Sequence, residues 1–223
     1  MPKRLEPFLI NHYYHIFNRL IDGHNFFKDH YYSSLFLDLL SYYLSNKATL
    51  SYSKFKRTPT RIQNEISLYL DYEKYHKVDI IAYCLMPTHF HILVRQKFEG
   101  GIVKYISDVI NSFTRKYNLE NRRKGPLFLP RFKSVSVVSD NQFIHVSRYI
   151  HLNPYSSGII NKVSNINKYP YSSLREYMGE SKLCKPNWLL SYFGMNKDKY
   201  TQFVLDNADY QKSLEELKYT DKW

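Results

Sequence analysis

The sequence predicts an α+β fold: a ferredoxin- or RRM-like antiparallel sheet packed by helices, with a small helical C-terminal appendage. The first observation is the order of periodic segments, which reads strand, helix, strand, strand, helix, strand, helix. The second is the length of 223 residues, which is enough to bury one sizeable core. Because the sequence has no internal repeat and no clear linker, we expect one main domain over residues 1–180 and the appendage over 181–223.

The first third of the chain predicts one strand and one helix. Residues 13–21 alternate and are rich in Tyr, Ile and Phe, which is typical of a strand. Asp29 is suited to cap a helix over residues 30–44. Residues 46–77 are less regular, with a helical pattern over 61–75, and this stretch is a candidate insertion. Its basic cluster consists of Lys54, Lys56, Arg57 and Arg61.

The middle of the chain predicts a hairpin followed by a helix. Residues 79–86 and 89–96 read as two strands joined tightly at Pro87-Thr88. A helix is expected over 102–119, after Gly100-Gly101. Residues 128–138 predict a further strand that carries Arg131 and Lys133.

A last helix of the main domain is expected over residues 141–152. Asp140 is its expected N-cap, and Pro154 together with Gly158 is expected to end it. From Pro186 onward the pattern predicts two or three short helices with mixed charge, which form the appendage.

The composition indicates a polyanionic partner. The net charge is +12, with 32 Lys and Arg against 20 Asp and Glu. Such an excess favours nucleic acid, although anionic membranes also attract basic proteins. The 22 tyrosines and 14 phenylalanines fill cores, but aromatics among Lys and Arg also suit a surface that stacks unpaired bases.

The cysteines and the first residues of the chain indicate the cellular compartment in which we expect the protein. Cys84 and Cys184 are the only cysteines, so a cysteine-based zinc ribbon is excluded and no disulfide framework is indicated. The first residues contain no apolar signal segment, and no run approaches the length of a membrane span. We expect a cytoplasmic protein that is associated with the nucleoid when bound to DNA.

The segment His89-Phe90-His91 is a candidate half of a metal site. Two histidines separated by one apolar residue in a strand project to the same face of a sheet. Parallel imidazoles are common ligands of divalent metals. Taken alone, such a pair is more often two surface histidines. His12, His15, His24, His30 and His76 are scattered, and the sequence gives them no role.

The expected helix over 141–152 supplies the second half of the site. Its apolar stripe, Phe143, Val146 and Ile150, should pack on the sheet. A neighbouring polar stripe contains Gln142, His145, Tyr149 and Asn153. Tyr149 and Asn153 therefore project side by side, one turn apart. The amide oxygen could complete coordination begun by the two imidazoles, and the phenol could attack a phosphorus atom bound to that metal.

Several motifs in order carry a more specific resemblance. They are Tyr14–Arg19, Met86–His91, Pro130–Ser134, Arg148–Pro154 and Tyr169–Ser173. With them the chain resembles the REP-associated tyrosine transposases, members of the HUH superfamily of single-tyrosine transposases, over roughly residues 10–180. Thr88 stands where that family usually has Asn, and Asn153 where related transposases carry Gln. Residues 46–77 are longer than the family pattern.

The resemblance implies metal-dependent cleavage and rejoining of DNA. His89 and His91 would bind Mg²⁺ or Mn²⁺, with Asn153 as third ligand, and Tyr149 would form a 5′-phosphotyrosine. Hairpin or single-stranded DNA ends would be the substrate. A general base is not identified, and His145 and His151 are the candidates. Tyr117 is the rival nucleophile, but its i+4 neighbour is no obvious ligand.

Basic residues bracket the predicted site in sequence and are candidates for phosphate contacts. They are Arg115, Lys116, Arg122, Arg123, Lys124, Arg131 and Lys133. The sequence leaves open whether the protein is a monomer or a homodimer.

Three other functions remain open. A non-catalytic RRM-like protein that binds single-stranded RNA or DNA would explain the charge and the aromatics without a metal. A replication-initiator or relaxase nickase would share the site chemistry, but those enzymes often carry a third histidine near the pair, and none is evident in the sequence. A zinc hydrolase has weaker support, because the chain has no HExxH pattern.

Overall fold

A four-stranded antiparallel sheet forms the centre of the molecule. The computed structural model describes residues 7–23, 25–179 and 182–220. The strands stand in the order β2-β3-β1-β4, and their bounds are β1 Tyr13–Arg19, β2 Val78–Met86, β3 His89–Gln96 and β4 Lys133–Val137. Because the helices between the strands follow the predicted order, the α+β, ferredoxin- or RRM-like prediction is confirmed.

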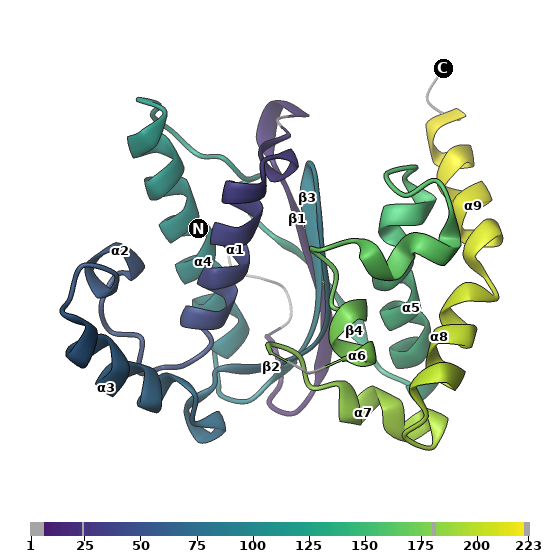
Figure 1. The fold of residues 1–223 in the computed structure, drawn as a ribbon, viewed down its shortest axis with the longest axis horizontal. Helices are drawn as coiled ribbons and strands as arrows, with labels where there is room; N and C mark the ends of the chain where they lie inside the picture. The colour runs from purple at the N-terminus through teal and green to yellow at the C-terminus, as the bar shows by residue number, and fades with distance from the viewer. Residues whose placement is uncertain (1–6, 24, 180–181, 221–223) are drawn as a thin grey trace.

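Helices cover both faces of this sheet, as Figure 1 shows with the strands seen between two helical layers. One layer contains α1 (His30–Tyr42) and α4 (Gly101–Glu120). Farther out on the same side lie α2 (Tyr52–Phe55) and α3 (Thr60–Leu70), followed by the 3-10 helix η3 (Glu73–Tyr75). The candidate insertion over 46–77 therefore forms the outer part of this layer.

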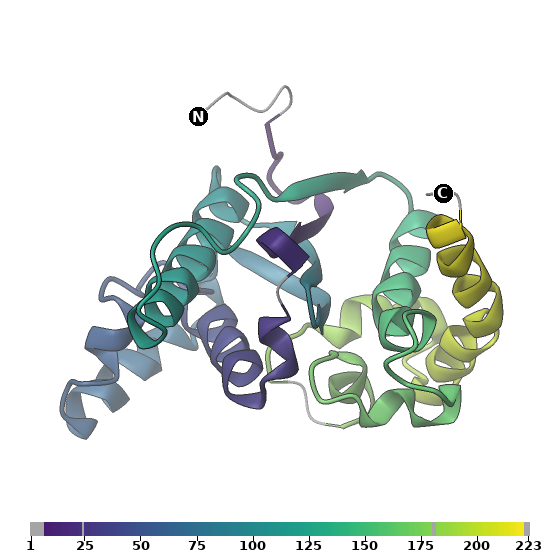
Figure 2. The same ribbon diagram turned by 90° about the horizontal axis from the view of Figure 1, so that it is seen from above.

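The second layer is built by the last helix of the main domain and by the C-terminal helices. The first of these is α5 (Asp140–Ser156), and α9 lies along it (Figure 2). The others are α6 Leu174–Met178, α7 Pro186–Leu190, α8 Lys197–Leu205 and α9 Ala208–Thr220. Short 3-10 helices complete the chain: η1 Ile21–Gly23, η2 Phe26–Lys28, η4 Val163–Lys168 and η5 Ser191–Phe193.

The C-terminal helices share a core with the sheet. Tyr200 and Val204 of α8 are fully buried in the same cluster as Ile150 and Leu152 of α5. The predicted boundary between residues 180 and 181 lies outside the described residues and stays a prediction. None of the helices within the described ranges is both long enough and apolar enough to cross a membrane.

Sequence signals predicted the N-cap of α1 correctly, but they gave the wrong residues for both ends of α5. The Asp29 side chain accepts a hydrogen bond from the Tyr31 amide and caps α1. For α5 the cap is Ser139, whose side chain accepts from the Gln142 amide, and not Asp140. The helix also runs through Pro154 to Ser156. A proline in the last turn removes one amide donor, and here the helix continues because its end is buried in the second layer.

The strand predicted over 128–138 is shorter than expected. β4 begins at Lys133, so Arg131 lies before the strand and not on it. Phe128 instead makes an isolated bridge with Leu20, which ties the segment before β4 to the end of β1.

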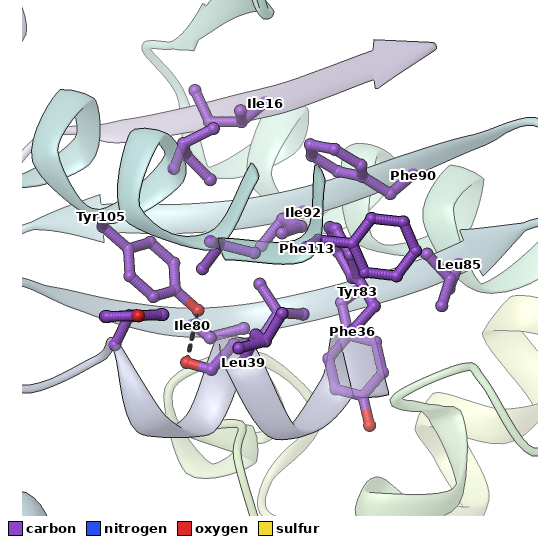
Figure 3. Close-up of a cluster of buried hydrophobic side chains, with 14 of the residues drawn as sticks. Ile16, Phe36, Leu39, Ile80, Tyr83, Leu85, Phe90, Ile92, Tyr105 and Phe113 are labelled. Carbon is purple, nitrogen blue, oxygen red and sulfur yellow. Dashed lines mark hydrogen bonds between the residues drawn. The ribbon is translucent and has the colours of Figure 1, made fainter. Parts of the chain in front are cut away.

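The core between the sheet and α1/α4 is rich in aromatic side chains (Figure 3). The Phe36 ring lies 5.2 Å from that of Phe90 and 5.4 Å from that of Phe113, measured between centroids. Tyr105 is fully buried, and its hydroxyl donates to the Leu40 carbonyl at 2.9 Å, so its polar atom is satisfied. The side chains of this core pack on one face of β3, and the histidines lie on its opposite face.

Replacing Phe36 with alanine should lower the free energy of unfolding by about 3–5 kcal/mol, because a fully buried ring is removed and a cavity remains. Urea unfolding followed by circular dichroism measures this change. As a matched control, Leu68→Ala on α3, where the side chain is 65% exposed, should change stability by less than about 0.5 kcal/mol. A loss of similar size in both variants would contradict the assignment of Phe36 to the core.

Candidate active site

The two predicted histidines lie on β3 and face the α5 layer. Alternation along β3 sends Phe90, Ile92 and Val94 into the core with α1 and α4, and sends His89 and His91 to the opposite face. His89 is half-buried and His91 is buried. The tight turn at Pro87-Thr88 pairs His89 with Met86, which fixes the start of the strand.

The structure brings Tyr149 to this pair. The centroids of the His89 and His91 rings are 5.0 Å apart, with the rings nearly perpendicular. The Tyr149 ring lies 5.5 Å from that of His91. Tyr149 is half-buried on α5, so its ring reaches the histidine face from the second layer. Three of the predicted site residues thus converge from two elements.

A third histidine adjoins the pair, which the sequence analysis missed. His15 on β1 places its Nε2 atom 2.9 Å from Nδ1 of His91, and its ring centroid lies 5.9 Å from that of Tyr149. The expectation that no third histidine lies near the pair was therefore wrong, and His15, to which the sequence analysis assigned no role, contacts His91. The alternating pattern of β1 could have shown that His15 points to one face of the sheet. The sequence did not give the register of β1 against β3, which brings His15 to His91. Burial lowers the pKa of His15 to about 4, so this ring is neutral at pH 7.

Hydrogen bonds orient both rings of the pair through their Nδ1 atoms. Thr88 Oγ1 lies 2.9 Å from Nδ1 of His89, and His15 holds Nδ1 of His91. Such partners fix the orientation and tautomer of a metal-binding histidine. A divalent ion would be held by two imidazoles whose orientation these contacts fix. Thr88, where the family pattern has Asn, still provides a hydrogen-bonding oxygen at this position.

Asn153 is buried one turn after Tyr149. Its side-chain amide donates to the Tyr149 carbonyl at 2.8 Å, and Gln211 of α9 donates to the same carbonyl at 3.1 Å. Within residues 7–23, 25–179 and 182–220, no hydrogen bond joins Asn153 to either histidine, and no group of three or more His, Cys, Asp or Glu forms a metal site. An amide oxygen suits Mg²⁺ or Mn²⁺ by donor type, whereas imidazole nitrogens bind a wider range of divalent ions. The role of Asn153 stays a prediction.

The two candidate bases lie in different surroundings. His151 is fully buried, with Nδ1 2.6 Å from the Tyr200 hydroxyl and Nε2 2.7 Å from Ser173 Oγ. These contacts fasten α5 to α8 and to the segment before α6. His145 is exposed, and its Nδ1 atom lies 2.7 Å from a guanidinium nitrogen of Arg148. A role of either residue as base stays a prediction.

The buried His151 makes stability depend on pH. Burial lowers its pKa from the ordinary 6.5 to about 3. Below pH 6.5 the unfolded state therefore binds a proton that the folded state does not, and stability falls as the pH falls. Between pH 7 and pH 5 this residue should cost about 2 kcal/mol. Urea unfolding at both pH values should show that His151→Gln flattens this dependence, whereas His12→Gln, at an exposed position, leaves it unchanged. An unchanged pH dependence in His151→Gln would contradict the assignment.

The rival nucleophile lies in the other layer. Tyr117 is on α4, and its ring contacts those of Phe26 at 4.1 Å and Tyr32 at 4.8 Å, between centroids. Because α4 covers the face of the sheet opposite His89 and His91, this position favours Tyr149 as the tyrosine that acts with the histidines.

Two basic side chains share the histidine face of the sheet. Residues that pair across antiparallel strands lie on the same face, and Arg19 pairs with His89. Phe17 pairs with His91 on one side and with Lys133 on the other, so Lys133 lies in the row of His91. Arg19 and Lys133 are both exposed. The sequence analysis named Arg19 only as part of a motif, and its place opposite His89 could not be read without the register.

The other predicted DNA contacts are exposed or half-buried around the end of α4. Arg123 donates to the carbonyls of Gly125 and Pro126 and so holds its own loop, and Lys116 pairs with Glu120 at 2.7 Å. The remaining ones are exposed: Arg115, Arg122, Lys124 and Arg131. The segment after this loop reaches the histidine end of the sheet, since the Leu129 amide donates to the Arg19 carbonyl at 2.9 Å. Their contacts with DNA stay predictions.

A family model and two solved structures resemble this chain. Residues 55–153 match the family model described as IS200-like transposase, a range that includes both histidines, Tyr149 and Asn153. No curated protein matches the chain. Among solved structures, a REP-associated tyrosine transposase bound to a REP hairpin resembles it with a TM-score of 0.53 and 16% identity, over 84% of this chain and 91% of that chain. A putative transposase from Deinococcus radiodurans R1 gives a TM-score of 0.36 and 14% identity, over 67% of this chain and 95% of that one. The predicted resemblance to the REP-associated tyrosine transposases is confirmed.

Proposed function

We propose that this chain, a transposase-family protein, cleaves and rejoins single-stranded DNA through a covalent bond to Tyr149. The observation that carries the proposal is the convergence of Tyr149 from α5 on the two histidines of β3, with 5.5 Å between the Tyr149 and His91 ring centroids. A histidine pair with oriented rings, facing one tyrosine, fits metal-assisted phosphodiester exchange better than a passive binding surface.

The chemistry follows from the residues in turn. The Tyr149 hydroxyl loses its proton and its oxygen attacks the scissile phosphorus, so a 5′-phosphotyrosine forms and the bond to the 3′ oxygen breaks. That oxygen takes up a proton and leaves as a free 3′-hydroxyl. The covalent bond conserves the phosphodiester energy, so attack by a second 3′-hydroxyl can rejoin DNA without ATP.

His89, His91 and, as a predicted third ligand, Asn153 would hold Mg²⁺ or Mn²⁺ beside the tyrosine. When bound, the ion would supply charge neutralisation at the scissile phosphate. His15 and Thr88 act on the two rings, because their hydrogen bonds keep each imidazole in one orientation. Arg19 and Lys133, exposed on the same face, would bind phosphates on either side of the reacting one.

Hairpin-containing DNA is the proposed substrate. A solved relative with a similar fold is bound to a REP hairpin, which supports the same class of partner for this chain. The net charge of +12 supports a polyanionic partner independently.

The proposal is tested by incubating the protein with Mn²⁺ and labelled single-stranded hairpin DNA, and by resolving the products on a denaturing gel. We expect a labelled protein band that resists SDS and is absent in EDTA. Failure to form an adduct across many hairpins, with tight binding retained, would overturn the enzyme assignment and favour the non-catalytic, RRM-like binder of single-stranded nucleic acid.

A further inference from the structure

A row of tyrosines on the outer layer is not used by the proposed site. Tyr69 lies at the end of α3, Tyr72 directly before η3 and Tyr75 at the end of η3. Successive ring centroids are 6.3 Å apart in both pairs, and successive rings are steeply inclined to each other, at 73° and 72°. The Tyr69 and Tyr72 side chains are 54% and 53% exposed. A single exposed aromatic side chain is ordinary, but several side by side often mark a binding surface.

Lysines accompany these rings. Lys74 Nζ lies 5.6 Å from the Tyr72 centroid and 4.9 Å from that of Tyr75, and Lys47 Nζ lies 4.6 Å from Tyr75. Neither lysine takes part in an ion pair within the described part of the chain. Two carboxylates occur in the same segment, Asp71 and Glu73, but Glu73 is paired with Lys185. The surface around the rings is therefore basic.

The backbone under the rings is held firmly. The Tyr75 carbonyl accepts from the Asn46 amide at 2.8 Å, and the Tyr75 amide donates to the Tyr72 carbonyl at 2.9 Å. His76 follows and places Nε2 3.0 Å from the Leu70 carbonyl, which ties the end of α3 to η3. The rings therefore stand on a fixed platform, which reduces the entropy that binding would cost.

We propose that Tyr69, Tyr72 and Tyr75, with Lys47 and Lys74, form a second binding surface for single-stranded DNA, at which bases stack on the exposed rings and phosphates meet the lysines. Ring faces beside ammonium groups are the combination by which proteins bind unpaired bases without reading their sequence. We call this surface the tyrosine platform.

The tyrosine platform lies far from the candidate active site. It adjoins the start of β2, at Val78, which pairs with Gln96 at the end of β3. His89 is at the other end of β3, and eight residues of extended strand span about 25 Å. The platform would therefore hold DNA that flanks the reacting segment and not the scissile phosphate itself. It also gives the 46–77 stretch a function.

The test compares paired substitutions in EDTA, where no cleavage occurs and Tyr149 is not needed. Affinity for a fluorescein-labelled oligothymidylate and for a DNA duplex of equal length is measured by fluorescence anisotropy. Tyr69→Leu/Tyr72→Leu should weaken binding of the single strand at least about fivefold per ring. The same variant should leave binding of the duplex unchanged, because paired bases are not free to stack.

Three controls define the outcome. Tyr69→Phe/Tyr72→Phe keeps the rings and should bind the single strand as the parent protein does. Tyr210→Leu, at a tyrosine that is 65% exposed on α9, should change nothing. Lys47→Gln/Lys74→Gln should weaken binding of both DNA forms and reduce the salt dependence. Equal affinity of the Leu and parent proteins, or a loss in the Phe variant as large as that in the Leu variant, would overturn the platform. Either result leaves the adduct test of the proposed function unaffected.

Discussion

Replacing Tyr149 with phenylalanine is expected to abolish the SDS-resistant adduct and to lower the rate of DNA cleavage by at least about a thousandfold, as removal of a covalent nucleophile commonly does. The substitution removes one oxygen atom and keeps the ring. Because Tyr149 is half-buried and its ring lies against His91, the fold and DNA affinity should persist. Single-turnover cleavage of the labelled hairpin, with binding measured in parallel, gives both quantities.

Tyr117→Phe is the matched control for this experiment. Tyr117 is the rival nucleophile of the sequence analysis, and it packs against Phe26 on the opposite side of the sheet. Its variant should cleave at the parent rate. An adduct that persists in Tyr149→Phe and disappears in Tyr117→Phe would reverse the assignment.

Replacing His91 with alanine is expected to weaken Mn²⁺ binding more than about a hundredfold and to remove metal-dependent cleavage, since loss of a ligand costs more than loss of its hydrogen-bond partner. The variant also leaves His15 without its partner at 2.9 Å. Mn²⁺ binding followed by electron paramagnetic resonance gives the affinity without relying on activity.

Two further variants distinguish a residue that binds the metal from a residue that only orients a metal ligand. His15→Gln keeps a polar group beside His91 and should reduce Mn²⁺ affinity only about ten- to a hundredfold, as expected for a group that orients a ligand. His12→Ala, at an exposed histidine before β1, should leave it unchanged. If His91→Ala bound Mn²⁺ with the affinity of the wild-type protein, the assignment of His91 as a metal ligand would be contradicted.

Most of the fold could be predicted because each element carries its own local signal. The β2–β3 hairpin follows from two apolar runs separated by Pro87-Thr88, and α1 follows from a cap at Asp29. The ends of α5 could not be predicted, because burial in the second layer carries the helix past Pro154. Local propensity does not contain that tertiary contribution.

The site was predicted in part for the same reason. The spacing of His89 and His91 and the one-turn spacing of Tyr149 and Asn153 are properties of single elements, and sequence reveals them. His15 and Arg19 join the site only through the register of β1 against β3, which depends on contacts between distant segments. Gln211 contacts the site because α9 packs on α5, and no pattern in the sequence predicted this packing.

The packing of the C-terminal helices on α5 bears on how the protein is made. A nascent chain that ends at residue 156 contains both histidines, Tyr149 and Asn153. It lacks Tyr200, which holds His151, and Gln211, which donates to the Tyr149 carbonyl. Most of the stability of a helix comes from its packing, and for α5 part of that packing forms only when the C-terminal helices have been made. Fragments released by ribosomes that stop early would therefore carry every predicted site residue and still lack the contacts through which the C-terminal helices hold α5 at Tyr149 and His151.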